Sequence, residues 1–224
     1  VYGVVMPDPP KSVAIVPGMR KEQVAAAFGT ALDWSKDQRQ IFLDSTEGAL
    51  YPSTYIIAAS TTPDEAITLI RERFDARVLA RYASSTHDII SVEDTLTIAS
   101  IIEREAGDVS EMRIISGILW NRLFADMRLQ ADTTLQYARG TAKNGWWPVP
   151  RSRDKFINSP YNTYQNAGLP PGPIASPSTA AIMAALNPEK TDCIFFFHAK
   201  GVFYCSVTYD QHVARLKKIY GRGK

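Results

Sequence analysis

The sequence of 224 residues predicts an α+β fold. Apolar residues recur at helical spacing in several segments, and short β-branched or aromatic runs near both ends of the chain are typical of strands. Hydrophobic residues make up 45% of the chain and charged residues 21%, which is ordinary for a soluble globular protein. The length allows one or two domains.

The first part of the chain is expected to alternate strands and helices. Gly and Pro supply the breaks between them, and Pro52 favours an edge position because it cannot donate to a strand ladder. The expected elements are, in order, a strand at 13–16, a helix at 21–28, a loop or edge strand at 47–55, a helix from 64 to about 82, and a polar break at 83–90.

Helices dominate the expectation for the rest of the chain. Gly107 is expected to end one helix, and Asp108 with Glu111 fits a capping box that starts the next. The expected elements are a helix at 94–106, a helix from 108 to about 123, a long loop at 140–177, a short helix at 178–186, a hairpin at 193–206 and a helix at 209–220. A loop this long and this aromatic indicates a functional segment rather than a disordered one.

The composition excludes some classes of function. A net charge of +2 argues against a protein that binds nucleic acid through bulk charge. No apolar run reaches the ~20 residues of a membrane span. The two cysteines, Cys193 and Cys205, cannot form a metal site alone. They fall on the two arms of the expected hairpin, where a disulfide and a pair of buried free thiols are both possible.

Glu105 is the unusual carboxylate of this sequence. At about 100° per residue, Ile98, Ile101 and Ile102 define one face of their helix, and Glu105 projects from the middle of that face. Burial raises the pKa of a carboxyl group, which suits a general acid near neutral pH. Glu103 points the other way and is expected to be solvated.

Periodicity alone leaves a second explanation of Glu105 open. An unpaired buried carboxylate is costly, so a structural ion pair with Arg122 or Arg128 would account for the same pattern. On helical spacing alone, that explanation is the more common one.

Several separate motifs are spread across roughly residues 13–220. The two most specific are Ser159-Pro-Tyr-Asn-Thr-Tyr164 and Leu169-Pro-Pro-Gly-Pro-Ile-Ala-Ser-Pro177. The others are Leu96–Glu105, Asn121–Leu123, Met127–Tyr137 and, more weakly, Val16–Met19 and Glu47–Tyr55. In this order and spacing the motifs resemble the MltG/YceG-like endolytic transglycosylases. The family's catalytic residue falls on the second glutamate of the Glu-x-Glu pair, which is Glu105.

The sequence departs from the family pattern at three of these positions. Thr133 stands where the family usually has Pro, Ser53 replaces an Asp, and Phe203 occupies a position that is often His, whereas His212 keeps its place. None of the three is expected to touch Glu105.

The resemblance implies a fold and a reaction. The fold is a small LysM-like N-terminal element, within residues 1–88, followed by a mixed α+β YceG-like catalytic domain at 89–224. The reaction is cleavage of peptidoglycan glycan strands between N-acetylmuramic acid and N-acetylglucosamine without water, with no metal and no cofactor. Glu105 would protonate the glycosidic oxygen and then take the proton of the muramic C6 hydroxyl, which closes a 1,6-anhydro ring. An intramolecular nucleophile removes the need for the second carboxylate of most glycosidases.

The resemblance also implies a substrate site around Glu105. The residues expected to bind sugar hydroxyls, acetamido groups or sugar rings, or to orient Glu105, are Gln130, Asp132, Tyr137, Asn162, Thr163 and Tyr164. Local backbone hydrogen bonding is the alternative for each polar residue in this set. Trp146 and Trp147 are candidates for an outer sugar subsite or a partner patch.

The expected setting is the cell wall. The family begins with a membrane-spanning helix, so the resemblance implies a single-pass anchor in the inner membrane, a periplasmic catalytic part, and peptidoglycan synthases as partners. Two other functions stay open: a wall-binding scaffold without turnover, and a muramidase that hydrolyses the same bond.

Overall fold

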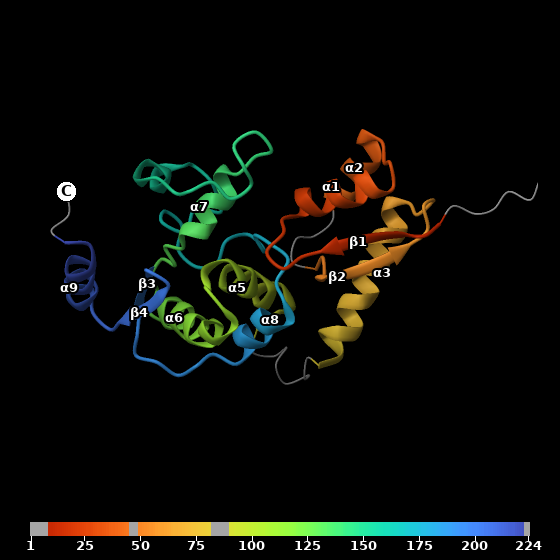
Figure 1. Ribbon diagram of the computed structural model, residues 1–224. Coiled ribbons are helices and arrows are strands. Elements are labelled where there is room, and N and C mark those ends of the chain that lie inside the picture. The colour runs from red at the N-terminus through yellow and green to blue at the C-terminus, as the bar shows by residue number, and fades with distance from the viewer. Residues whose placement is uncertain (1–8, 45–48, 82–89, 222–224) are drawn as a thin grey trace, which may run out of the picture.

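The computed structural model describes residues 9–44, 49–81 and 90–221. In these residues helices dominate, and two antiparallel strand pairs lie toward opposite ends of the molecule, as Figure 1 shows. The α+β class is therefore confirmed. No helix in these ranges is long and apolar enough to cross a membrane.

The N-terminal part is built on two paired strands, β1 (Lys11–Ile15) and β2 (Ser53–Ile57). Val13 lies opposite Tyr55 in the register, and alternate residues of both strands are buried. The strand predicted at 13–16 is confirmed with a shift to 11–15. The segment predicted as a loop or an edge strand is irregular through Pro52 and becomes a strand of a two-stranded sheet from Ser53. Residues 47 and 48 of the predicted segment lie outside the described residues.

Three helices surround this strand pair: α1 (Lys21–Ala31), α2 (Lys36–Leu43) and α3 (Pro63–Arg77). The first and third confirm the predicted helices, although α3 ends earlier than expected and a 3₁₀ turn follows at Leu79–Arg81. Helix α2 was not predicted, because its one buried residue, Phe42, gives no periodic apolar pattern. The polar break at 83–89 lies outside the described residues.

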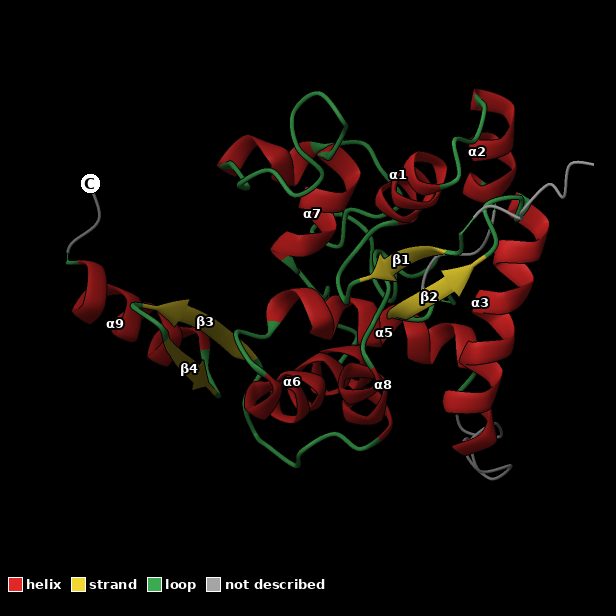
Figure 2. Ribbon diagram, turned by 45° about the vertical axis from the view of Figure 1, so that its right-hand side comes forward, coloured by secondary structure: helices red, strands yellow, loops and turns green. Residues whose placement is uncertain are grey.

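The second part of the chain packs three helices together: α5 (Val92–Glu105), α6 (Met112–Phe124) and α8 (Thr179–Leu186). Figure 2 shows these helices side by side. Ile98, Ile101 and Ile102 of α5 are fully buried, as the helical face predicted. The capping pair is partly as expected: Asp108 accepts the Ser110 N–H, and Glu111 accepts the N–H of Gly107.

The long loop is held in place at its C-terminal end. It follows α7 (Asp132–Arg139), a helix that was not predicted, and has no regular element besides a 3₁₀ turn at Ser152–Phe156 and an isolated bridge. The N–H of Ile174 donates to Ser100 Oγ at 2.9 Å, and Ser176 exchanges backbone hydrogen bonds of 2.8 Å with Gly18 and Met19. The loop thereby joins α5 to the N-terminal part.

A hairpin and a last helix complete the chain: β3 (Phe195–Ala199), β4 (Val202–Ser206) and α9 (Tyr209–Tyr220). Lys200 and Gly201 both have positive φ, at 53° and 74°, which is the backbone that a two-residue hairpin turn requires. Cys193 and Cys205 form a disulfide at the base of the hairpin, so the free-thiol alternative is wrong.

Candidate active site

Glu105 is the last residue of α5 and lies beside the start of α7. The residue keeps partial exposure while its carboxyl group is largely removed from solvent. The helix stops here because Ala106 leaves the helical conformation, at ψ 135°, and Gly107 follows it. The carboxyl group therefore projects from the end of α5 toward the start of α7.

Thr133 holds this carboxyl group directly. Its hydroxyl donates to Glu105 Oε1 at 2.9 Å, and its backbone N–H donates to the same oxygen at 3.3 Å. The expectation that no departure from the family pattern touches Glu105 is wrong, because a contact between residues 28 positions apart depends on tertiary packing.

Burial is the main influence on the pKa of Glu105. It raises this pKa above the ordinary value, and the negative charge of Asp132 acts in the same direction. The hydrogen bonds from Thr133 and the charge of His198 lower the pKa without offsetting the burial. The protonated form of Glu105 thus persists to higher pH than in an ordinary glutamic acid.

The two structural explanations for the glutamates do not hold. Glu105 takes no part in the ion pairs of the described residues, and Arg122 instead donates to the carbonyl oxygens of Leu129 and Ile194. Glu103 is not a freely solvated side chain, because its carboxylate accepts the N–H and the hydroxyl of Ser178 at the start of α8. A sequence pattern does not show these pairings, because both partners are distant along the chain.

Asp132 and Tyr164 form a pair next to Glu105. The Tyr164 hydroxyl donates to Asp132 Oδ1 at 2.7 Å, and the Lys155 ammonium lies 4.8 Å from the centre of the Tyr164 ring. Burial raises the pKa of Tyr164, and the hydrogen bond to Asp132 raises it further. The hydroxyl is therefore a stable donor. Exposed Gln130 lies beside them, with a left-handed backbone (φ 48°) and an N–H bonded to the carbonyl oxygen of Thr163.

Asn162 and Thr163 are buried, at 0% and 1% exposure. The Asn162 amide donates to two carbonyl oxygens of the loop and accepts the Tyr164 N–H. The Thr163 hydroxyl accepts the Ala131 N–H and bonds the Thr134 hydroxyl. These side chains fix the loop against the start of α7, and neither contacts Glu105 in the hydrogen bonds of the described residues.

Comparison with known proteins places this chain in a family. The sequence profile of the YceG-like family matches residues 4–218, nearly the whole chain. The chain belongs to the YceG-like family. A solved structure of a YceG-like protein from Listeria monocytogenes superposes with a TM-score of 0.81 at 29% identity, covering 93% of this chain and 76% of that one.

Two relatives of this YceG-like chain carry the name endolytic murein transglycosylase. Those of Streptococcus pneumoniae serotype 2 and Bacillus subtilis are each 37% identical to it over 151 residues, or 67% of this chain. The chain spans 27% of the first and 41% of the second.

An aromatic and cationic cluster borders the site of this YceG-like chain. The Arg20 guanidinium lies 4.0 Å from the centre of the Tyr137 ring, and that of Arg104 lies 4.0 Å from the centre of a Trp147 ring. Tyr137 also packs against Tyr161, with ring centroids 4.7 Å apart. Tyr137 and Trp147 are thus half-buried in protein contacts, which limits the ring surface left for sugars.

His198 was not among the predicted residues. Its Nε2 lies 2.8 Å from Glu111 Oε2, and the same oxygen accepts the N–H of Gly107, two residues after Glu105. His198 lies directly opposite Phe203 in the hairpin, the position that is often His in the YceG-like family. The expected pairing of residues 198 and 203 across the hairpin was the sequence feature that could have pointed to His198.

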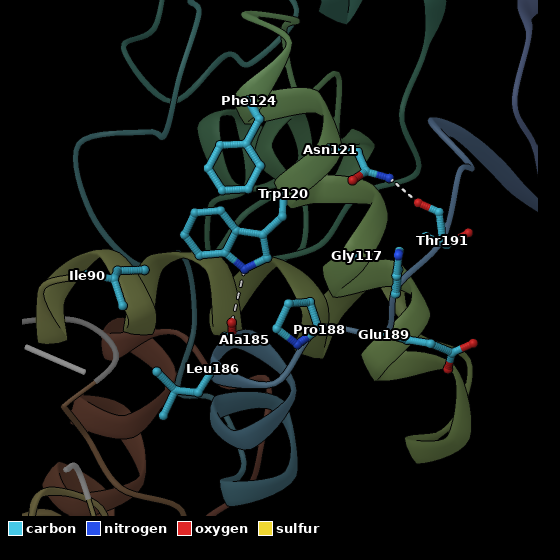
Figure 3. Close-up of a pocket in the computed structure, with 11 residues that line it drawn as sticks. Ile90, Gly117, Trp120, Asn121, Phe124, Ala185, Leu186, Pro188, Glu189 and Thr191 are labelled. Carbon is cyan, nitrogen blue, oxygen red and sulfur yellow. Dashed lines mark hydrogen bonds between the residues drawn. The ribbon is translucent and has the colours of Figure 1, made fainter. Parts of the chain in front are cut away.

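A separate hollow of about 500 Å³ lies between α6, α8 and the segment after α8 (Figure 3). The rings of Trp120 and Phe124 stack along one side of it, and the Trp120 indole N–H donates to the Ala185 carbonyl oxygen. Neither Glu105 nor any predicted substrate residue lines it.

Proposed function

We propose that this chain is the catalytic part of an endolytic lytic transglycosylase that cleaves the bond between N-acetylmuramic acid and N-acetylglucosamine in peptidoglycan. The observation that carries the proposal is the Glu105 carboxyl group, held by Thr133 at the end of α5, with a pKa that burial raises. The names of the relatives support the same activity.

In this proposal Glu105 acts twice. It first gives its proton to the glycosidic oxygen as the bond from that oxygen to muramic C1 breaks. The C6 oxygen of the same sugar then bonds to C1, and its proton returns to Glu105. The product is a 1,6-anhydro end, and no water is consumed. Because the nucleophile belongs to the substrate, its position is already set.

Other residues near Glu105 have supporting roles in this proposal. Exposed Gln130 and the Asp132–Tyr164 pair are placed to bind sugar hydroxyl and acetamido groups. Asn162 and Thr163 hold the loop that carries Tyr164, since their polar atoms are used within the protein. Tyr137 contributes an edge of the site rather than an open stacking face.

A hydrolytic muramidase is the second candidate, because of Asp132. This carboxylate is close enough to Glu105 to raise its pKa. Two neighbouring carboxylates are the arrangement that hydrolytic glycosidases use, with one as acid and the other as base or nucleophile. Asp132 would then activate the water that a transglycosylase does not need.

Product analysis separates these candidates. Purified glycan strands are incubated with the protein, and the new ends are analysed by mass spectrometry. Anhydro ends, lighter by one water than reducing ends, are expected; reducing ends would establish the muramidase.

The variant Glu105→Gln is expected to abolish product release. Glu103→Gln, two residues away on the same helix, is the matched control and is expected to retain release. No release by the unmodified protein would favour a wall-binding scaffold, and release by Glu105→Gln would remove Glu105 from the mechanism.

The setting of the protein belongs to the same proposal. Relatives that act on murein favour an extracytoplasmic location. We propose a single-pass anchor in the inner membrane with a periplasmic catalytic part, and peptidoglycan synthases as partners. The division into a LysM-like element and a catalytic domain near residue 88 is likewise a proposal; that boundary lies outside the described residues.

A further inference from the structure

Thr133 donates hydrogen bonds to only one of the two oxygens of the Glu105 carboxyl group in the described structure. Both of its donors, the hydroxyl at 2.9 Å and the backbone N–H at 3.3 Å, point at Oε1. Thr133 is 5% exposed and is the second residue of α7, where a helix leaves N–H groups without intrahelical partners. The backbone of the helix start therefore fixes the N–H donor, and the hydroxyl donor belongs to a buried side chain of the same residue.

A protonated carboxyl group has one O–H donor, while its other oxygen only accepts. An oxygen that already accepts two hydrogen bonds is a poor place for the proton. We propose that Thr133 is a positioning residue that keeps Oε1 of Glu105 as the accepting oxygen, so that Oε2 carries and transfers the proton.

This inference rests on the proposed function and makes it more specific. The proton on Oε2 passes to the glycosidic oxygen as the bond to C1 breaks. The C6 hydroxyl proton returns to Oε2 as the C6 oxygen bonds to C1. Oε1 remains bound to Thr133 throughout, so the carboxyl group does not need to rotate between the two steps.

The residue at position 133 determines whether these two hydrogen bonds to Glu105 can form. Proline, which the YceG-like family usually has at this position, has neither an N–H nor a hydroxyl to donate. In this chain the two hydrogen bonds lower the pKa of Glu105 against the larger effect of burial. The other charged or titratable groups whose electrostatic effect couples to Glu105 are Arg104 on α5, Arg122 on α6, Asp132 on α7, Tyr164 on the loop and His198 on β3.

The direct test is a ¹³C NMR titration of the glutamate carboxyl carbons in the whole chain. The Glu105 resonance is assigned by its loss in Glu105→Gln. Thr133→Val removes the shorter hydrogen bond, so the Glu105 midpoint is expected to rise by about 0.5 pH unit or more. Thr133→Ser keeps both donors and is expected to restore the original midpoint.

Thr97→Val is the matched control. Thr97 is 2% exposed, and its hydroxyl bonds only the Glu93 carbonyl oxygen within α5. Its replacement is expected to leave the Glu105 midpoint unchanged. Thr133→Pro removes both donors and is expected to shift the midpoint further than Thr133→Val; it serves as a second variant, because the first turn of a helix tolerates proline.

Activity gives an independent comparison. In Thr133→Val the alkaline limb of anhydro-product release should move to higher pH together with the NMR midpoint. Equal Glu105 midpoints in Thr133→Val, Thr133→Pro and the unmodified protein would overturn the inference, whatever the activity. Absence of anhydro products with a shifted midpoint would overturn the proposed function while supporting the role of Thr133 at the carboxyl group.

Discussion

The Glu103 carboxylate accepts both the backbone N–H of Ser178, at 2.9 Å, and its hydroxyl, at 2.6 Å. Ser178 itself is the N-cap of α8 and accepts the N–H of Ala181. Glu103 and Glu105 thus have different contacts at the end of α5. The first fixes the neighbouring helix, and the second faces the candidate site.

Replacement of Glu103 by Ala should therefore reduce stability more than activity. The variant loses two hydrogen bonds to a charged acceptor, and we expect unfolding free energy to fall by about 1–3 kcal/mol. Urea denaturation followed by circular dichroism measures this loss. At a temperature well below the new Tm, product release should stay within about twofold of the unmodified protein. A release defect as large as that of Glu105→Gln would contradict this division of roles.

Glu105→Gln should have the opposite effect on stability. Burial raises the pKa of Glu105 in the folded state, so the folded protein binds more protons than the unfolded chain between the unfolded and folded pKa values. The contribution of Glu105 to stability consequently falls as pH rises through that window. At neutral pH the variant should melt a few degrees higher, the size of effect that ~1 kcal/mol produces in a protein of this length. Below the unfolded pKa the two proteins should melt together, and scanning calorimetry at both pH values tests the sign.

Tyr164→Phe keeps the ring and removes only the hydroxyl that donates to Asp132. If this pair binds sugar as proposed, kcat/KM for glycan strands should fall at least about tenfold, because one hydrogen bond to a charged group is worth about 1.5–3 kcal/mol. Tyr204→Phe, on β4, is the matched control. An unchanged kcat/KM in Tyr164→Phe would remove the pair from the substrate site.

Gly117→Ala should destabilise the protein although alanine normally stabilises a helix interior by about 1 kcal/mol relative to glycine. Gly117 lies in α6, and an added Cβ would stand 2.2 Å from the Glu189 carbonyl oxygen. Relief of this contact requires the backbone after α8 to move, at a cost of about 1–3 kcal/mol. Thermal melting of Gly117→Ala checks the sign, and a Tm equal to or above that of the unmodified protein would contradict it.

Helical spacing predicted the elements whose apolar faces are long and regular. It placed Ile98 and Ile101 in the core, where both are fully buried. It did not show that α5 is buried on all sides from Thr95 to Ile102. Helix α7 has only eight residues and follows a left-handed Gln130, so its pattern was too short to stand apart from the loop.

The hydrogen-bond partners of the candidate site residues could not be predicted from one sequence. The Thr133 contact joins two elements whose packing is set by everything between them. Asn162 and Thr163 were expected to bind sugar groups or to orient Glu105, with local backbone hydrogen bonding as the alternative. Their residue types do not show that they are buried, at 0% and 1% exposure. The family resemblance located Glu105, and the structure supplied what holds it.

The reciprocal backbone hydrogen bonds between Ser176 and the Gly18–Met19 turn have a consequence for how this protein loses its structure. They tie the end of the long loop at 140–177 to the N-terminal part, so neither part can open without exposing backbone groups of the other. Chemical denaturation should accordingly give one cooperative transition that is shared by probes in both parts. A fragment that begins after residue 90 would lack those partners, and its loop would start from a larger ensemble of conformations.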